Sequence, residues 1–501
     1  MVGAAGAGAS AAALLAHHAG AVVSGCDPGG PGPYTSAVEA AGIELAWAHD
    51  AAHVADASAP RVERLAVTKA LTSVQPDHPE LEAARRNEIP VEPWQQLIAD
   101  AALSQGGRLI AVAGTHGKST TTGWLVHLLT AAGMDPAAFV GALLDPQVTG
   151  GPPATARWGR GAAFVVEADE YAGNFDPYRP HIAVLLNAEW DHPDVFADEA
   201  AVLVAFERWI RGAGREGWAP TLVANAGDPG VARLLGRLAD WSGHLVEYRL
   251  NTRPARPYQP HHTALGPTRQ LAGELVEEGG WELRFRWTGA AEAAQAPEVA
   301  DTAEAQVVLP LPGRHNAENA LAVAATALLL GVSVQDIGRH LGSYRGVGRR
   351  LEVKGEVDGI TVLDDYAHHP TAIRATMSAV RERFPGRRLW AVYEPLTYHR
   401  TAAMLQSFAD VLADADVALV AEIWAGRDPD TTITSAEALA QAIEARGRAS
   451  AVAPGSVEKT ADQLHTRVRP GDVVLVMGGG RSYVIAERLV ALLRGEDLAA
   501  G

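Results

Sequence analysis

The sequence predicts an α/β protein of three domains, each built around a mainly parallel sheet covered by helices. Short apolar strand runs alternate with amphipathic helices along most of the chain, which is the pattern of such sheets. The chain has 501 residues, enough for two to four domains that each bury a core. We expect a Rossmann-like domain over 1–106, a larger central domain over 107–343 and a second Rossmann-like domain over 344–501.

The first domain opens on a glycine-rich turn at 2–8. An Ala/Leu helix follows, then a short strand at 21–23, and Asp27 stands about twenty positions after the turn. This order resembles a dinucleotide-type phosphate fold, although Ala5 replaces the middle glycine of the turn. Almost no strand precedes the turn, so either the chain start is misassigned or the first strand is truncated.

The strongest local signal is a loop between an apolar strand at 109–113 and a helix that follows it. Its glycines let the backbone wrap around phosphate oxygens, and the new helix directs free N–H groups toward them. Lys118 supplies a charge for the phosphates and Ser119 a hydroxyl for Mg²⁺. The loop is a short variant, with Val112 where the usual pattern has glycine. The predicted nucleotide-binding residues are Gly114, Thr115, His116, Gly117, Lys118, Ser119 and Thr120.

Two later strands of the central domain end in side chains of the kind that bind metals. A strand at 164–166 leads into Glu167, and a strand at 182–186 leads toward His192. Ligands bind at the carboxyl ends of parallel strands, and Mg²⁺ on a triphosphate needs only one or two protein carboxylates. Glu167 is therefore a natural partner for Ser119. His192 would hold a second cation or a phosphate; the alternative is a capping histidine among surface acids.

Residues 250–305 interrupt the alternating pattern of the central domain. Segments at 281–287 and 306–309 alternate in polarity and predict a β-rich antiparallel extension, to which we assign no chemistry. The third domain has four clear strand runs, at 360–363, 389–393, 417–423 and 473–477. Helical patterns separate these runs, as in a doubly wound sheet.

Two further polar clusters stand next to these elements. Polar residues at 313–319 precede an apolar helix; Asn316 either caps that helix or contacts the adenine or ribose of the nucleotide. The segment 364–370 ends a strand of the third domain with acids and histidines. Buried charge at that place would be costly unless it serves a site.

Composition narrows the functional classes. The formal charge is −17, so the chain has no general attraction for nucleic acid or anionic membranes. Cys26 is the only cysteine, which excludes a disulfide framework and fits a reducing compartment. The apolar start lacks the basic region of a secretory signal, because the first Lys or Arg is Arg61. We expect a soluble cytoplasmic protein without nucleic-acid or membrane partners.

Taken in order, the motifs resemble those of the Mur ligase family over essentially the whole chain. They are GTHGKST at 114–120, EADE at 167–170, NAEWDH at 187–192, GRHNAENALA at 313–322, GVGRRLE at 346–352, DDYAHHPTAI at 364–373 and YHRT at 398–401. The resemblance implies a UDP-sugar domain, a central phosphate-loop ATPase and a C-terminal amino-acid domain. It implies an ATP- and Mg²⁺-dependent ligase that phosphorylates the lactyl carboxylate of UDP-N-acetylmuramate, in the synthesis of peptidoglycan precursors.

The resemblance also implies a role for individual residues. Lys118 would hold the γ-phosphate, and Arg349 would lie near the phosphates. Ser119, Glu167 and His192 would hold Mg²⁺. The residues that would face the nucleotide are His315, Asn316 and Asn319. Those that would cradle the UDP group are Gly6, Gly8, Ser10, Asp27 and His49. Those that would line the amino-acid side are Tyr366, His368, His369 and Arg400.

The resemblance leaves the incoming amine open. L-alanine is the expected acceptor, and the segment 398–401 favours it. The run 189–196 and the pair Pro93–Trp94 favour a ligase that adds a tripeptide to the same sugar nucleotide during cell-wall recycling. Leu396 stands where a histidine is expected on the amino-acid side. A non-catalytic UDP-sugar or ATP-binding regulator is the third reading, although the catalytic-type residues are all present. We expect a monomer or homodimer.

Overall fold

The computed structural model describes residues 1–55, 61–214, 217–251, 259–276, 281–288, 302–426, 428 and 430–496. The chain divides into two compact units, each considered by itself below. The first comprises Met1–Glu189, Glu199–Pro310 and Asn316–Val347. The second comprises Trp190–Asp198, Leu311–His315 and Gly348–Gly501. The predicted α/β class is confirmed, whereas the three domain boundaries stay a prediction.

The N-terminal part of the first unit has two short parallel strand pairs, and Val2 forms hydrogen-bonded contacts with both. The strands are β1 (Ser24–Cys26), β2 (Glu44–Ala46), β3 (Leu65–Val67) and β4 (Val91–Pro93). Val2 forms a parallel bridge with Cys26 and donates its N–H to Ala66 O at 3.0 Å, so it stands in place of a first strand. The strand expected at 21–23 forms instead at β1, and Val22 is 96% exposed. The strand begins later because only from Ser24 onward does the backbone pair with a neighbour.

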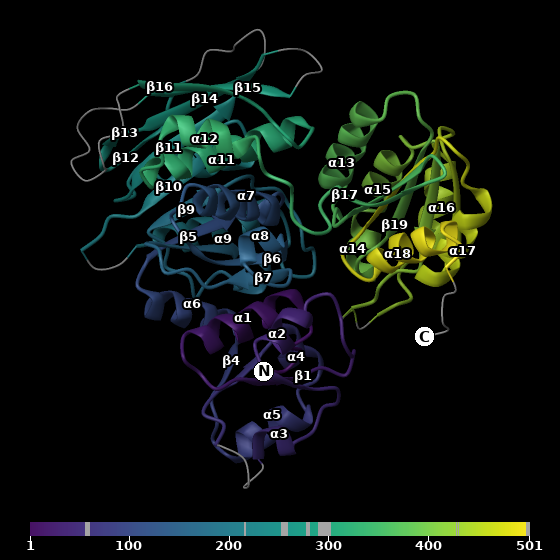
Figure 1. Ribbon diagram of the computed structural model, residues 1–501, viewed down its shortest axis with the longest axis horizontal. Helices are drawn as coiled ribbons and strands as arrows, with labels where there is room; N and C mark the ends of the chain where they lie inside the picture. The colour runs from purple at the N-terminus through teal and green to yellow at the C-terminus, as the bar shows by residue number, and fades with distance from the viewer. Residues whose placement is uncertain are drawn as a thin grey trace. The chain divides into compact units, whose positions relative to one another are not determined.

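Helix α1 (Ala7–His18) connects this part to the rest of the first unit (Figure 1). It packs on α6 (Trp94–Gln105), and the approach is close because position 8 is glycine. A Cβ on Gly8 would lie 2.3 Å from the Trp94 ring. The remaining helices of this part are α2 (Ser36–Ala40), α3 (Ala52–Ala55), α4 (Lys69–Val74) and α5 (Pro79–Arg86).

A ten-stranded sheet forms the body of the first unit, in the order β16-β15-β14-β11-β10-β9-β5-β8-β6-β7. Its strands are β5 (Arg108–Ala113), β6 (Ala137–Leu144), β7 (Ala154–Arg157), β8 (Ala163–Ala168), β9 (Ile182–Leu185), β10 (Thr221–Asn225), β11 (His244–Leu250), β14 (Arg269–Leu275), β15 (Glu282–Thr288) and β16 (Thr302–Val308). Strand β5 lies between β8 and β9, parallel to both, as its apolar sequence predicts.

The predicted antiparallel extension is confirmed at one edge of this sheet (Figure 1). Strands β14, β15 and β16 pair antiparallel, and β12 (His262–Thr263) with β13 (Gly266–Pro267) forms a separate small ribbon. The parts of the predicted extension at 252–258, 277–280 and 289–301 lie outside the described residues. The unit's other helices are α7 (Lys118–Ala131), α8 (Pro146–Thr149), α9 (Glu199–Arg211), α10 (Pro229–Arg237), α11 (Arg314–Leu329) and α12 (Val334–Leu341), with a short 3₁₀ turn at Tyr171–Gly173.

The second unit is built on a six-stranded sheet in the order β17-β18-β22-β19-β20-β21. Its strands are β17 (Glu352–Val357), β18 (Ile360–Asp365), β19 (Leu389–Glu394), β20 (Val417–Ala421), β21 (Ser450–Gly455) and β22 (Val473–Gly478). The four predicted strands all form. The two edge strands, β17 and β21, are not predicted from the sequence, because one is largely polar and the other ends in Pro-Gly.

Helices cover both faces of this second sheet and create two separate cores. The helices are α13 (Pro370–Arg383), α14 (Tyr398–Ala403), α15 (Leu405–Leu412), α16 (Ala436–Glu444), α17 (Val457–Arg467) and α18 (Ser482–Leu493). One core joins α13, α15 and α16 to the sheet, and the other joins α17 and α18 to it. Trp190 packs against the first of these cores, which explains why Trp190–Asp198 clusters with this unit. Among the described helices, none is long and apolar enough to cross a membrane.

Candidate active site

The predicted phosphate loop connects β5 to α7, and its two glycines are required by the backbone. Gly114 has φ +143° and Gly117 has φ +80°, both unfavourable for other residues. A Cβ on Gly114 would lie 3.1 Å from Asn187 N, and one on Gly117 would lie 2.8 Å from Asn319 Oδ1. The loop therefore approaches two neighbouring segments more closely than a side chain would allow.

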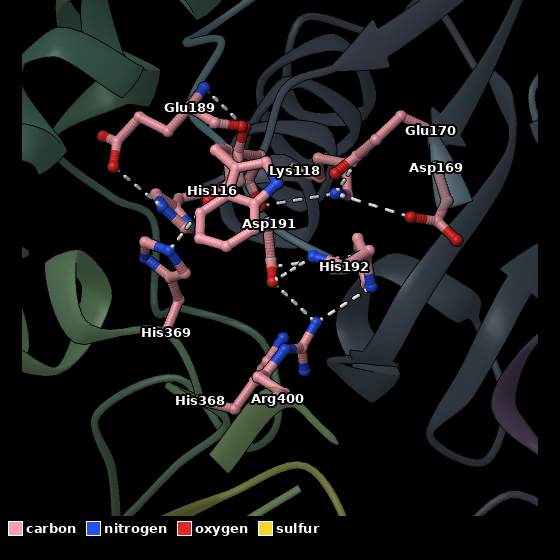
Figure 2. Close-up of polar contacts among 12 residues, drawn as sticks. His116, Lys118, Asp169, Glu170, Glu189, Asp191, His192, His368, His369 and Arg400 are labelled. Carbon is pink, nitrogen blue, oxygen red and sulfur yellow. Dashed lines mark hydrogen bonds and ion pairs between the residues drawn. The ribbon is translucent and has the colours of Figure 1, made fainter. Parts of the chain in front are cut away.

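Hydrogen bonds from the segment after β9 hold this loop in place. Asn187 Oδ1 accepts from His116 N at 2.8 Å, and Asn187 Nδ2 donates to His116 O at 3.0 Å. Thr115 Oγ1 donates to Glu189 O at 3.1 Å and accepts from Glu189 N at 2.9 Å. His116 Nε2 lies 3.6 Å from Glu189 Oε2 (Figure 2). Two reciprocal pairs thus fix the backbone of the loop before any ligand binds.

Lys118 begins α7, and its ammonium group lies among oxygen atoms (Figure 2). It donates to Gly114 O at 2.7 Å and to Glu170 Oε2 at 2.8 Å, and Asp169 Oδ1 lies 3.6 Å away. Burial alone would lower the pKa of Lys118, but the negative charges of Glu170 and Asp169 outweigh it and raise the pKa. The amine is therefore charged at neutral pH, as binding to a phosphate requires.

Ser119 and Glu167 lie together at the start of α7 and the end of β8. Ser119 Oγ, in a side chain that is almost wholly buried, donates to Glu167 Oε1 at 3.0 Å. Glu167 Oε2 accepts from Gly141 N at 2.6 Å, and a Cβ on Gly141 would lie 2.8 Å from that oxygen. A hydroxyl and a carboxylate are hard oxygen donors of the kind that Mg²⁺ prefers beside a triphosphate. This donor set fits Mg²⁺.

The first turn of α11 places two asparagines beside the loop. Asn319, buried, lies against Gly117, and its Nδ2 donates to Asn316 Oδ1 at 3.3 Å. The capping interpretation of Asn316 is wrong, because α11 begins at Arg314 and Asn316 lies inside the helix. His315 falls in the second unit, where a Cβ on Gly313 would lie 2.5 Å from its ring. The nucleotide contacts assigned to these three side chains stay a prediction.

The residues predicted to cradle UDP have different surroundings. Gly6 precedes the first residue of α1, and Asp27 Oδ2 accepts from Ala5 N at 3.1 Å. Ser10 is fully buried and shares a hydrogen bond of 3.1 Å with Thr155 Oγ1. Gly8 makes room for Trp94, as described above. His49 is part of a cluster of metal-type side chains that is considered separately below. The substrate role of this set stays a prediction.

In the second unit, Arg349 is held by several partners at once. Its Nε donates to Asp364 Oδ2 at 3.1 Å, and its Nη2 donates to Gly478 O at 2.9 Å and to Ser482 Oγ at 2.8 Å. The guanidinium also lies 5.1 Å from the centre of the Tyr366 ring. Arg349 has φ +59°, a strained value for a side chain of this size. These contacts fix its orientation at the carboxyl edge of the sheet.

Three of the residues predicted to line the amino-acid side follow the end of β18 in the chain. His368 is half-buried and its Nδ1 lies 2.9 Å from Tyr366 O, so Nδ1 carries the proton. Burial, together with the charge of Arg400, holds the pKa of His368 well below its usual range, so its ring is neutral. His369 caps α13, accepting from Thr371 N at 3.3 Å through Nδ1. Its Nε2 lies 3.3 Å from Trp190 O.

Arg400 connects α14 to the segment 190–198 within the same unit (Figure 2). Its Nη2 lies 2.9 Å from Asp191 Oδ1 and 2.9 Å from His192 Nδ1, and the Arg400 and Asp191 side chains are buried. Arginine only donates, so His192 Nδ1 accepts and its proton resides on Nε2. In this conformation His192 could bind a metal only after its bond to Arg400 is broken. Ser119 and Glu167 belong to the other unit, so the shared metal site stays a prediction.

Sequence reasoning passed over three residues that the structure places around the loop. Asp169 and Glu170 stand two and three positions after Glu167 and pair with Lys118, and Asn187 holds the loop backbone. All three lie in runs that the sequence singles out, at 167–170 and 187–192. The signal that could have found them is their position at the carboxyl ends of β8 and β9, beside β5. Asp191, the partner of Arg400, was passed over in the same way.

Comparison with known families places the chain in a defined class. Residues 1–105 match the Mur ligase family catalytic domain, 112–327 the Mur ligase middle domain and 349–480 the glutamate ligase domain of Mur ligases. The chain belongs to the Mur ligase family.

Individual relatives resemble it over nearly its full length. A UDP-N-acetylmuramate–L-alanine ligase of Roseiflexus sp. (strain RS-1) is 36% identical, covering 99% of both chains. A solved UDP-N-acetylmuramate–alanine ligase from Thermotoga maritima has the same fold, with a TM-score of 0.74 at 23% identity over 99% of this chain and 98% of that one. A murein peptide ligase from Psychrobacter arcticus superposes with a TM-score of 0.70 at 25% identity over 100% and 99%.

Proposed function

We propose that this protein is an ATP-dependent ligase that joins L-alanine to the lactyl carboxylate of UDP-N-acetylmuramate, a step in peptidoglycan precursor synthesis. The observation that carries the proposal is the preformed phosphate loop, with a charged Lys118 at its centre. Relatives of the same length that carry the name UDP-N-acetylmuramate–L-alanine ligase support the choice of substrates. The expected products are ADP, phosphate and the new amide.

The reaction consists of two displacements. The lactyl carboxylate attacks the γ-phosphorus of ATP, and the bond to the β,γ-bridging oxygen breaks to leave ADP. The alanine amine then attacks the acyl phosphate, and the tetrahedral intermediate expels phosphate. The protein's task in both steps is to position the reactants and neutralise charge. Lys118, fixed by two carboxylates, moves its ammonium contact to the γ-phosphate when ATP binds.

A magnesium ion would be held by Ser119 and Glu167. When bound, Mg²⁺ supplies charge neutralisation to the phosphate oxygens. The hydrogen bond between the two side chains keeps their oxygens 3.0 Å apart, and Gly141 N holds the second carboxylate oxygen. Replacing Glu167 removes the only negative charge of this pair.

A second candidate function is a ligase that adds a tripeptide to the same sugar nucleotide. The resemblance to the murein peptide ligase from Psychrobacter arcticus favours it. The two functions share the phosphate loop and differ in the acceptor amine. The residues proposed to contact that amine are Tyr366, His368, His369 and Arg400.

The acceptor is identified by phosphate release from purified protein with UDP-N-acetylmuramate, ATP and Mg²⁺. L-alanine, glycine, L-serine and the tripeptide L-Ala-γ-D-Glu-diaminopimelate are compared at equal concentration. We expect the highest kcat/KM with L-alanine. Preference for the tripeptide would select the second function. Phosphate release that no amine stimulates would exclude both, and would leave a nucleotide-binding regulator.

The loop is tested by Lys118→Ala, with Lys459→Ala, an exposed lysine of the second unit, as the control. We expect turnover to fall by about 100- to 1,000-fold, as for loss of one charge-stabilising group in a transition state. Binding of UDP-N-acetylmuramate, measured by calorimetry, should be unchanged. Wild-type turnover in Lys118→Ala would show that the loop is misassigned.

A further inference from the structure

Five side chains with metal-binding chemistry meet in the N-terminal part of the first unit. Cys26 ends β1, His49 follows β2, His53 lies on α3, and His78 and Glu80 stand at the start of α5. Cys26, His78 and Glu80 are buried, at 3%, 4% and 0% exposed. The five residues come from four segments of the chain, and their ligand atoms fall into two groups that share Glu80, each within 4.8 Å.

Glu80 is the centre of the cluster, and each of its carboxylate oxygens faces a different group. Oε1 lies 2.8 Å from Cys26 Sγ and 2.8 Å from His53 Nδ1. Oε2 lies 3.3 Å from His49 Nδ1 and 3.2 Å from His78 Nδ1. Cys26 Sγ is also 3.4 Å from His49 Nδ1. Donor atoms on one tetrahedral Zn²⁺ ion lie about 3.3–3.7 Å apart, as follows from Zn–N and Zn–S bonds of about 2.0–2.3 Å. The contacts of His49 with Glu80 and with Cys26 have this spacing, whereas the two contacts of 2.8 Å at Oε1 are hydrogen bonds.

The cluster is not satisfied by its own hydrogen bonds. Among the described residues, neither ring nitrogen of the buried His78 has a hydrogen-bond partner, and neither has Glu80 Oε2; His78 Nδ1 and Oε2 lie 3.2 Å apart, at an ion-pair distance. Buried polar atoms without a hydrogen-bond partner lower the stability of the folded state, so such groups call for a partner. A cation between them would take up both the lone pairs of the histidines and the negative charge of the carboxylate.

We propose that this cluster is a binding site for one divalent transition-metal ion of the zinc class. Cys26 and Glu80 supply two of the four ligands of a tetrahedral site, and His49 and His78, which face Glu80 Oε2, supply the other two. His53 keeps its hydrogen bond to Glu80 Oε1 and orients that carboxylate. Thiolate and imidazole donors select Zn²⁺ and similar ions over Mg²⁺, which prefers oxygen. On binding, the Cys26 thiol loses its proton to solvent and its hydrogen bond to Glu80 is replaced by a metal–sulfur bond.

The site would act on the fold of the N-terminal part. Its ligands come from β1, the segment after β2 and the start of α5, so one ion would tie three segments together. Binding to the folded state alone raises stability by linkage. The proposal does not depend on the proposed ligase activity, because metal binding is measured on the protein without substrates.

The test uses the full chain, freed of its affinity tag and stripped of metal. Zn²⁺ is added in the presence of excess Mg²⁺, which occupies oxygen-rich sites, and bound zinc is measured by mass spectrometry after dialysis. We expect one equivalent in the wild type and in His262→Gln, which removes an exposed histidine elsewhere. Cys26→Ser should weaken zinc binding by more than about 100-fold, the upper range for loss of a mere outer-shell partner.

Cobalt supplies a second, spectroscopic readout. Co²⁺ bound to Cys26 gives a sulfur-to-cobalt charge-transfer absorption in the near ultraviolet, which Cys26→Ser abolishes and His262→Gln keeps. Circular dichroism checks that Cys26→Ser is folded, and Glu80→Gln repeats the comparison. Zinc content in the wild type no higher than in Cys26→Ser, or a cobalt adduct without the sulfur band, would overturn the proposal. Loss of ligase activity with normal zinc binding would concern the proposed function only.

Discussion

Gly117 combines a backbone constraint with a steric one. Its φ of +80° disfavours any Cβ, and a Cβ there would lie 2.8 Å from Asn319 Oδ1. We expect Gly117→Ala to lower stability by about 1–2 kcal/mol, the cost of the left-handed conformation, and also to displace Asn319. Affinity for a non-hydrolysable ATP analogue, measured by calorimetry, should fall at least tenfold.

A matched control separates the two constraints at Gly117. Gly133, just after α7, has φ +76° but no atom within 4 Å of its would-be Cβ. Gly133→Ala should lower stability by a similar amount and leave nucleotide affinity unchanged. Equal affinity in the two variants would mean that the contact with Asn319 does not shape the nucleotide site.

The ionisation of Asp364 makes the stability of the second unit depend on pH. Burial raises the pKa of Asp364 to about 6, even though Arg349 opposes the shift. Between the unfolded pKa of about 3.9 and that value, the folded state binds more protons than the unfolded state. This carboxyl therefore lowers stability as pH rises from about 4 to about 6, by at most about 3 kcal/mol.

Asp364→Asn should remove that dependence. Urea unfolding of the wild type and the variant at pH values from 4 to 7 gives the difference in unfolding free energy. We expect the unfolding free energy of the variant to rise relative to that of the wild type as pH rises through this window. Losing the ion pair with Arg349 shifts the whole curve and does not remove this trend. Asp462→Asn, an exposed acid paired with Arg488, should show no such trend. Parallel curves for Asp364→Asn would contradict a raised pKa.

At the scale of the elements, sequence reasoning is most successful where one signal dominates. The strands β5, β18, β19 and β22 are buried on both faces, so their apolar runs identify them. The edge strands β17 and β21 are missed because an edge needs no apolar run. The strand near 21–23 is misplaced because apolar sequence alone does not decide which residues find a pairing partner; Val22 finds none.

The candidate site follows the same division. The glycines and Lys118 of the loop can be predicted from the sequence, because phosphate binding requires those residue types in that order. The partners Asp169, Glu170 and Asn187 depend on which strands lie beside β5, and a single sequence does not specify strand order. Arg400 and its partner Asp191 are more than 200 positions apart, so no local sequence pattern predicts their pairing.

That pairing determines how α14 holds the segment 190–198. Arg400 and Asp191 are both about 3% exposed, so removing one partner leaves the other charge buried. We expect Arg400→Met to lower the unfolding free energy of the second unit by about 3–5 kcal/mol at pH 7. Burial would raise the pKa of Asp191, but His192 and Arg400 outweigh it and hold the pKa well below its usual range.

The sign of the pH effect follows from that lowered pKa. The pair's contribution is complete above the unfolded pKa of about 3.9 and is lost as pH falls through the lower folded value. The deficit of Arg400→Met, measured by urea unfolding, should therefore shrink on acidification, when Asp191 can be protonated. Arg448→Met, which breaks an exposed pair with Asp414, should cost less than about 1 kcal/mol. An equally small cost at Arg400 would show that Asp191 finds another partner.

At the scale of the whole molecule, the two compact units have separate cores and should unfold as separate cooperative blocks. The sheet of the second unit is covered on both faces by its own helices, and the first unit packs Trp124 of α7 against Tyr344. Domains that bury separate cores commonly unfold in distinct steps. We expect scanning calorimetry of the substrate-free protein to resolve two transitions.

Variants in each unit assign these transitions. Trp124 is fully buried, so Trp124→Ala should cost about 3–5 kcal/mol and lower the melting temperature of one transition only. Arg400→Met should lower the other only, because effects at sites without shared partners do not couple. Lys459→Ala should move neither. A single transition that both Trp124→Ala and Arg400→Met lower would mean that the units fold as one cooperative body.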